Sequence, residues 1–527
     1  MQHDVIHHWG AVPVGDSAAP LVATGPGRYP CVAMGQDIDR EDFDEADYER
    51  FVELLQQDLQ ALRELVARPG FGEGPPSVGA EVELCLVDAD GRPLLRNLEV
   101  VEACDDERVT VELNRFNLEF MTTPRPLAGS PFTALGAEIQ ELLERLNQAA
   151  RAHDGRVAAV GILPTLRPED VQSEALTDVA RFRALSKGIR RLRHGGFDVV
   201  IDGPDPLDIT CDDVTFEGAN TSLQLHVRVS PSEFADTFNA AQIATGPVLA
   251  IAGNSPTFLG HRLWEETRIP LFKQAVDERD EVTESWRPAR VSFGNGWVRE
   301  GALELFTETV ALHAPLLPVV GREDSVAAVR RGETPILEEL RLHHGTVWRW
   351  NRAIYDPKGG GHLRIELRCL PSGPSVIDMQ ANMALLVGLT FGLREQVEWM
   401  TTALPFENAE RNGYRAAKHG LEAMLLWPSH TPPSPQPIPA RALLLDLLPT
   451  ARAGLDVLGV DAEEADKLLG VVAERLETCQ TGAHWQRCML ERLERDRPRE
   501  AALAAMLDRY LENAASGEPV HRWPLDP

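Results

Sequence analysis

Four short segments far apart in the chain carry acidic, amide, imidazole or guanidinium side chains between β-forming residues. The segments are GAEVEL at 79–84, VELNRFNLEF at 111–120, SLQLH at 222–226 and RIELR at 364–368. Side chains of a strand alternate between two faces. The polar residues that would share a face are Glu81 with Glu83, Gln224 with His226, and Arg364 with Glu366 and Arg368. Carboxylates suit hard divalent cations and arginines suit phosphates, so the pattern predicts a metal and nucleotide site on one face of a sheet.

Each signal also has a simpler interpretation. Two glutamates at alternate positions often form only a solvated face, but Val82 and Leu84 make the opposite face of the first segment apolar. Glu112 and Glu119 lie seven residues apart, so an unbroken strand would put them on opposite faces. They converge only if the chain turns or bulges between them. A lone histidine such as His226 is more often structural than a ligand.

The segment before Arg364 is rich in glycine. It reads KGGGH at 358–362, so the backbone amides of Gly360 and Gly361 could face a polyphosphate together with Arg364 and Arg368, while Glu366 holds its magnesium ion. A glycine hinge beside a salt-bridged strand is the simpler alternative. The chain has no Walker loop, G-x-G-x-x-G, G-x-S-x-G or H-E-x-x-H motif. A nucleotide would therefore be held in another way, and serine hydrolase and zincin chemistry have no support.

The elements around these segments mix helices with antiparallel strands. Apolar spacing predicts helices over 48–66 and 131–153, a buried strand over 157–162, and a turn at Asp88–Gly91 that would close a hairpin. We expect three regions: an N-terminal lead-in and helix over 1–74, a catalytic domain over 75–426, and a C-terminal region over 427–527. The last region begins with a proline-rich connector at 427–440 and continues as helices over 441–515.

Composition limits the partners. The net charge of -29 disfavours binding to nucleic acids and to anionic membranes, which leaves small substrates or a basic partner open; we expect small-molecule substrates. The seven cysteines show neither a C-x-x-C pair nor zinc spacing. There is no signal-peptide pattern and no apolar run of membrane-spanning length, so we expect a cytoplasmic protein. The sequence does not indicate an oligomeric state.

Taken in order, the motifs resemble a known family, the carboxylate–amine ligases of the glutamate–cysteine ligase type within the glutamine-synthetase-like superfamily. The resemblance covers about residues 75–450 and rests on these segments: GAEVELCLVD at 79–88, LEFMTTP at 118–124, SLQLHV at 222–227, AGNSPTFLG at 252–260, FGNGWV at 293–298, HLRIELRCLPSGPSVIDMQAN at 362–382 and YRAAKHGLEA at 414–423. It implies an α+β fold with a curved, mostly antiparallel sheet flanked by helices. It also implies ATP and two or three Mg²⁺ ions in the concave face, with Mn²⁺ as a possible substitute.

The resemblance assigns roles to individual residues. Arg368 would contact the ATP phosphates, and Arg368 and Glu366 would be the catalytic pair. The implied metal ligands are Glu81, Glu83, Glu112, Glu119, Gln224 and Glu366. Many relatives have histidine at the position of Gln224, so His226 is an alternative ligand.

The reaction that the resemblance implies joins a carboxylate to an amine. ATP converts the carboxylate to an acyl phosphate, and the amine then displaces phosphate. By analogy the donor is the γ-carboxylate of L-glutamate and the acceptor is L-cysteine, as in glutathione biosynthesis. Three alternatives stay open: a ligase for another amine, a non-catalytic nucleotide or metal sensor of the same fold, and a metal-dependent hydrolase that uses no ATP.

Overall fold

The centre of the protein is an antiparallel sheet. The computed structural model describes residues 38, 40–193, 195–279, 284, 286–429 and 434–526. Within them the main strands run in the order β11-β12-β8-β1-β3-β2, and the short strands β4 and β5 also pair with β1. Their bounds are β1 Ser77–Val87, β2 Val109–Val111, β3 Asn117–Met121, β4 Arg125–Pro126, β5 Arg156–Ala158, β8 Ser222–Val229, β11 Asn351–Asp356 and β12 His362–Pro371.

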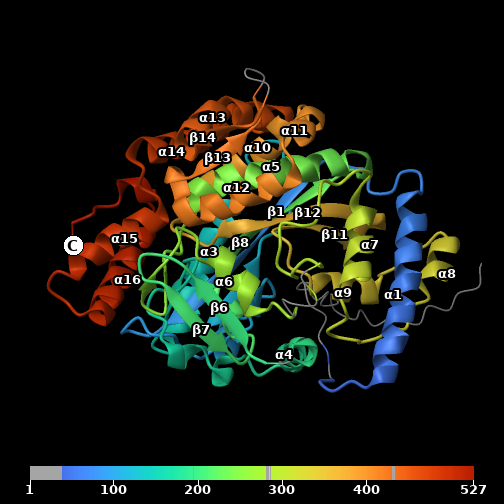
Figure 1. The fold of residues 1–527 in the computed structure, drawn as a ribbon, viewed down its shortest axis with the longest axis horizontal. Coiled ribbons are helices and arrows are strands. Elements are labelled where there is room, and N and C mark those ends of the chain that lie inside the picture. The colour runs from blue at the N-terminus through green and yellow to red at the C-terminus, as the bar shows by residue number, and fades with distance from the viewer. Residues whose placement is uncertain are drawn as a thin grey trace, which may run out of the picture.

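Helices cover the apolar face of this sheet. Val78, Ala80, Val82 and Leu84 of β1 are at most 2% exposed and belong to one core cluster with apolar residues of the neighbouring strands and helices. Helices α3 (Pro131–Arg151) and α5 (Phe234–Ala252) contact the strands, and α10 (Val376–Arg394) packs on both helices. Beyond α10 lie α13 (Ala440–Val457) and α14 (Ala462–Thr478), so the helices form successive layers (Figure 1). The layers leave the other face of the central strands for polar side chains.

The remaining elements surround the sheet edges (Figure 1). Near β11 lie α1 (Glu45–Val66), α7 (Ala302–Leu312), α8 (Ser325–Arg330) and α9 (Glu338–Gly345). A separate hairpin, β6 (Phe197–Ile201) with β7 (Leu207–Cys211), is accompanied by α4 (Ala180–Leu192) and α6 (Arg268–Ala275). The others are α2 Asn97–Cys104, β9 Thr257–Phe258, β10 His261–Arg262, α11 Val397–Ala403, α12 Phe406–His419, β13 Met424–Trp427, β14 Gln436–Pro439, α15 Gly482–Leu493 and α16 Arg499–Ala515. The predicted α+β class, with a mostly antiparallel sheet flanked by helices, is confirmed.

Several local predictions can now be compared with the structure. The helices expected at 48–66 and 131–153 are present as α1 and α3, and 441–515 is helical, whereas the strand expected over 157–162 is limited to β5. The Asp88 turn is present, because the Asp88 N–H donates to the Arg92 carbonyl at 2.9 Å. The chain then returns antiparallel through the Val87–Pro93 bridge, and the Leu94 N–H donates to the Leu86 carbonyl at 2.9 Å. The expected hairpin is therefore present but short, because the chain next enters α2.

The proline-rich segment also differs from the prediction. Its two ends pair as the antiparallel strands β13 and β14, so these ends form a ribbon rather than a plain connector. Residues 430–433 between them, and residues 1–37 of the predicted lead-in, lie outside the described part of the chain. Among the described residues one helix, α10, is long and apolar enough to cross a membrane. However, 83% of its apolar window is buried inside the protein, as in a core helix.

A buried carboxyl group joins α1 to α9 at the edge of the sheet. Asp58 is 3% exposed, and its Oδ2 accepts a hydrogen bond from the Leu340 N–H at 3.1 Å. Burial, assisted by the nearby carboxylates of Glu339 and Glu323, raises the pKa of Asp58 to about 7. The folded protein therefore binds a proton here at pH values where the unfolded chain has lost it.

This pKa gives a prediction for Asp58→Asn, which keeps an oxygen acceptor for Leu340. In the unfolded chain the pKa of Asp58 is that of an ordinary aspartate, near 3.8, so between about pH 4 and 7 the folded wild type binds more protons than the unfolded chain. Its free energy of unfolding should therefore fall as pH rises through this window, by roughly 1–4 kcal/mol more than that of the variant. Urea denaturation of both proteins at several pH values measures this, and parallel pH profiles would contradict it.

Candidate metal and nucleotide site

Three neighbouring strands bring two carboxylates and an imidazole together. Glu81 lies on β1, His226 on β8 and Glu366 on β12, and His226 stands directly opposite Glu366 in the β8–β12 register. The His226 Nε2 atom is 2.9 Å from Glu81 Oε1 and 3.7 Å from Glu366 Oε1. One ligand atom from each of the three residues lies within 4.8 Å of the others. The His226 Nδ1 atom is buried without a hydrogen-bond partner.

A second group of carboxylates lies on the β2–β3 side of the first. Glu83 stands directly opposite Glu119 in the β1–β3 register. Glu112 follows β2 and reaches this side because the chain turns at Asn114–Asn117, where the Asn117 N–H donates to the Asn114 carbonyl at 2.8 Å. The predicted turn between Glu112 and Glu119 is thus confirmed. Gln224 belongs with this group, since its Nε2 donates to Glu83 Oε1 at 2.7 Å.

Within the described part of the chain, no ion pair reaches the carboxylates of this second group. Glu119 is only 7% exposed, and no hydrogen bond or ion pair reaches its carboxylate among the described residues. Burial, followed by repulsion from Glu81 and Glu112, raises the pKa of Glu119 well above its usual value. Burial and Glu112 likewise raise the pKa of Glu83 to about 7. Oxygen ligands that are buried and uncompensated fit the requirements of Mg²⁺ or Mn²⁺, so the donor set fits the metal ions that the sequence predicts.

Two arginines compensate the charge of the first cluster. Arg352 on β11 makes a double contact with Glu366, with Nε at 2.5 Å from Oε2 and Nη2 at 2.9 Å from Oε1. Arg368 Nη1 donates to Glu366 Oε1 at 3.1 Å and also to Gln224 Oε1. Although burial opposes ionisation, these arginines and His226 hold the pKa of Glu366 far below its usual range. The Glu366 carboxylate therefore stays ionised although it is buried within the sheet.

Arg352 was not predicted as a site residue. The segment NRAIYD at 351–356 does not alternate polar and apolar residues, so it lacks the signal that identified the other strands. Nothing in the sequence indicates that Arg352 pairs with Glu366, because that contact depends on the register of β11 against β12.

Three residues predicted to bind the ATP phosphates, Gly360, Gly361 and Arg364, precede Glu366 in the chain and lie at or before the start of β12. Arg364 forms an ion pair with Asp356, with Nη1 at 3.4 Å from Oδ2. Gly360 and Gly361 both have positive φ, 88° and 89°, in the turn that precedes β12. Gly361 is five residues before Glu366, or about 16 Å along an extended strand. The structure does not bring the glycines into the carboxylate cluster, and their contact with ATP stays a prediction.

The comparison with protein families identifies the chain. The family model described as "Glutamate-cysteine ligase family 2" matches residues 77–506. The chain belongs to this family. It is therefore an ATP-dependent carbon–nitrogen ligase of the carboxylate–amine type. The match includes every strand that contributes to the two carboxylate groups.

Two solved structures are similar to this chain. A glutamate–cysteine ligase from Francisella tularensis, in complex with AMP, has a TM-score of 0.54 and 12% identity, covering 86% of this chain and 91% of that chain. A bifunctional glutathione synthetase from Pasteurella multocida has a TM-score of 0.44 and 13% identity, covering 89% of this chain and 55% of that chain. No curated protein sequence matches the chain. The first structure supports the glutamine-synthetase-like fold expected for the family.

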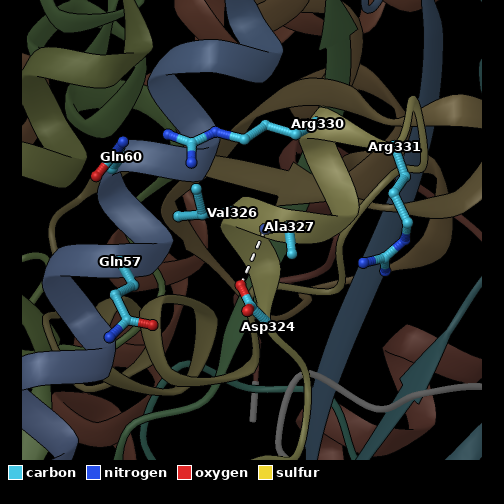
Figure 2. Close-up of a pocket in the computed structure, with 7 residues that line it drawn as sticks. All are labelled: Gln57, Gln60, Asp324, Val326, Ala327, Arg330 and Arg331. Carbon is cyan, nitrogen blue, oxygen red and sulfur yellow. Dashed lines mark hydrogen bonds between the residues drawn. The ribbon is translucent and has the colours of Figure 1, made fainter.

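A surface hollow of about 550 Å³ lies between α1 and α8, away from the two groups of carboxylates on the sheet (Figure 2). Its basic residues are already paired. Arg330 contacts Glu64 at 3.3 Å, and Arg331 contacts Glu333 at 2.7 Å. The hollow contains none of the residues predicted to bind metal or nucleotide.

We predict that Glu81→Gln weakens the binding of Mn²⁺ at least about tenfold, because it removes a charged ligand at nearly constant volume. Calorimetric titration with Mn²⁺ measures the affinity, and the thermal midpoint of the metal-free protein shows whether the variant folds. Glu49→Gln, an exposed change on α1, is the control. Unchanged Mn²⁺ affinity in a folded Glu81→Gln protein would remove this carboxylate from the metal site.

Proposed function

We propose that the protein uses ATP to join the γ-carboxylate of L-glutamate to the amine of L-cysteine through an acyl phosphate. The observation that carries the proposal is the cluster of Glu81, His226 and Glu366, in which Glu366 accepts hydrogen bonds from Arg352 and Arg368. The cluster lies inside the part of the chain that the family model matches. The AMP complex of the structurally similar Francisella tularensis ligase adds support for nucleotide binding.

The residues of the cluster have separate tasks in this proposal. Glu81, His226 and Glu366 would hold one divalent cation, and Glu83, Glu112 and Glu119 would hold another. Bound metal ions would neutralise the phosphate charge that develops during transfer. Gln224 donates to Glu83 and accepts from Arg368, so it connects the two groups and is a positioning residue as well as a candidate ligand.

The two arginines that contact Glu366 would have different tasks. Arg352 fixes the orientation of the carboxylate through its double contact. Arg368 carries the guanidinium that would grip oxygens of the transferred phosphate. Burial of the surrounding carboxylates indicates a site with little bulk water, which would protect an acyl phosphate from hydrolysis until the amine attacks.

Arg368→Lys tests the role of the guanidinium fork. Lysine keeps the charge but cannot make the planar double contact, so we expect a loss of roughly 1–3 kcal/mol in transition-state stabilisation, or about a 5- to 150-fold lower kcat/KM for ATP. Arg364→Lys is the matched comparison on the same strand and should have the smaller effect. Steady-state phosphate release measures both, and an Arg368→Lys enzyme with wild-type parameters would refute the assignment.

The identity of the acceptor requires a screen of amines. We expect phosphate release from ATP to need Mg²⁺ and L-glutamate and to accelerate with L-cysteine, with α-aminobutyrate as a partial substitute because the amine is the nucleophile. Mass spectrometry should detect the γ-glutamyl amide. An amide formed only with a different amine would replace cysteine as the acceptor. Absence of any amide and of any amine-stimulated turnover would favour a non-catalytic sensor.

A further inference from the structure

Helix α15 carries a cysteine and a histidine in direct contact. Cys488 Sγ lies 3.3 Å from His484 Nε2, and the two residues are four apart, about one helical turn. Cys488 forms no disulfide, and no other hydrogen bond or ion pair reaches either side chain within the described part of the chain. Figure 1 shows α15 beside α16 at one end of the molecule, whereas β1 and β8 lie nearer its middle. The pair is therefore separate from both groups of carboxylates.

The packing of α15 fixes which of its side chains face outward. Trp485 and Met489 are at most 1% exposed and belong to a buried apolar cluster. At the start of the helix the Thr481 Oγ1 accepts a hydrogen bond from the His484 N–H at 3.1 Å. Because the buried face and the first turn are held in this way, His484 and Cys488 lie on the partly exposed side, where solutes reach them.

The separation of the two side-chain atoms suits a tetrahedral metal ion. Metal–sulfur and metal–nitrogen bonds of about 2.3 and 2.0 Å at a tetrahedral angle place sulfur and nitrogen about 3.5 Å apart. The observed 3.3 Å is close to this value, so an ion would require little movement of either side chain. Glu491 is exposed on the same face, three residues after Cys488 and seven after His484. Its carboxylate must rotate to reach an ion at the pair, which its exposure allows.

We propose that His484 and Cys488 bind a divalent cation of the Zn²⁺ class, with Glu491 and water as the remaining ligands. A thiolate with an imidazole and a carboxylate is a donor set of zinc sites, whereas Mg²⁺ prefers oxygen ligands alone. This metal site goes beyond the proposed ligase reaction, because it uses none of the residues to which that reaction gives a role.

The protonation states of the pair are compatible with a bound cation. Burial, followed by the Arg487 guanidinium, lowers the pKa of His484, so the imidazole is neutral at neutral pH and has a lone pair to offer. Arg487 itself forms an ion pair with Glu265, which reduces its repulsion of a cation. Burial raises the pKa of the Cys488 thiol, so this thiol loses a proton to solvent when the cation binds.

Cobalt tests the proposal, because a thiolate bound to Co²⁺ gives a sulfur-to-metal charge-transfer band in the near ultraviolet that carboxylate and imidazole ligands do not give. The full chain, reduced with a phosphine and kept in excess Mg²⁺ so that the carboxylate groups are occupied, is titrated with Co²⁺. We expect a band that saturates at about one ion per chain and disappears when Zn²⁺, which binds such sites more tightly, is added.

Four variants assign the ligands. Cys488→Ser should abolish the band, and His484→Gln should weaken Co²⁺ binding at least about tenfold. Glu491→Gln should weaken it by a smaller factor, because water can replace the lost oxygen. Cys479→Ser changes the other partly exposed cysteine among the described residues, so it is the matched control and should keep the band. Thermal midpoints of the metal-free variants show whether each one folds.

The other outcomes overturn the proposal. Wild-type protein without the band leaves the thiol as a hydrogen-bond donor to His484 alone. A band that survives Cys488→Ser places the sulfur ligand at another cysteine, and unchanged Co²⁺ affinity in His484→Gln shows an isolated thiol rather than a pair. Ligase assays are independent of these results. Amide formation without the cobalt band refutes only this metal site, and the band without amide formation refutes only the proposed ligase reaction.

Discussion

The structure depends on keeping several carboxylates together on one buried face of a sheet. Glu81, Glu83, Glu119 and Glu366 come from adjacent strands, and three of them are at most 7% exposed. Like charges in a medium of low polarity repel strongly, so this arrangement needs both a rigid support and opposing charge. The apolar face of β1, packed on the helices, supplies the support. Arg352 and Arg368 form ion pairs with Glu366, whereas no ion pair among the described residues reaches Glu83 or Glu119.

An irregularity in β12 places one of these arginines. The register of β12 against β8 shifts between Leu367 and Leu370, whereas on the other side of β12 the Arg368 N–H donates to the Trp350 carbonyl at 2.9 Å and continues the register with β11. A bulge changes the direction of a side chain, and here the Arg368 guanidinium contacts both Glu366 and Gln224. Strict alternation would already put Arg368 on the face of Glu366, but the shared contact with Gln224 depends on the local geometry.

The sequence predicts those parts of the site that depend on a single strand. Alternation identifies the shared faces of Glu81 with Glu83 and of Gln224 with His226, and the seven-residue spacing of Glu112 and Glu119 requires the turn that the structure contains. The pattern within one strand does not predict the contacts between strands. The approach of His226 to Glu81 and the pairing of Arg352 with Glu366 depend on the order and register of strands that are distant in sequence.

The C-terminal helices are joined by buried polar contacts to the elements that support the sheet. Arg475 of α14 is 1% exposed and donates to Asp378 Oδ1 of α10 at 2.7 Å, and α10 packs on the helices that support the sheet. Tyr510 of α16 donates to the Ala159 carbonyl just after β5, and Asn254 Nδ2 donates to the Tyr510 hydroxyl. A buried ion pair that loses one partner is strongly destabilising, so α10 and α14 depend on each other. Because the carboxylates must be held against their mutual repulsion, the helices that brace α10 contribute to the site although none of their side chains lies within it.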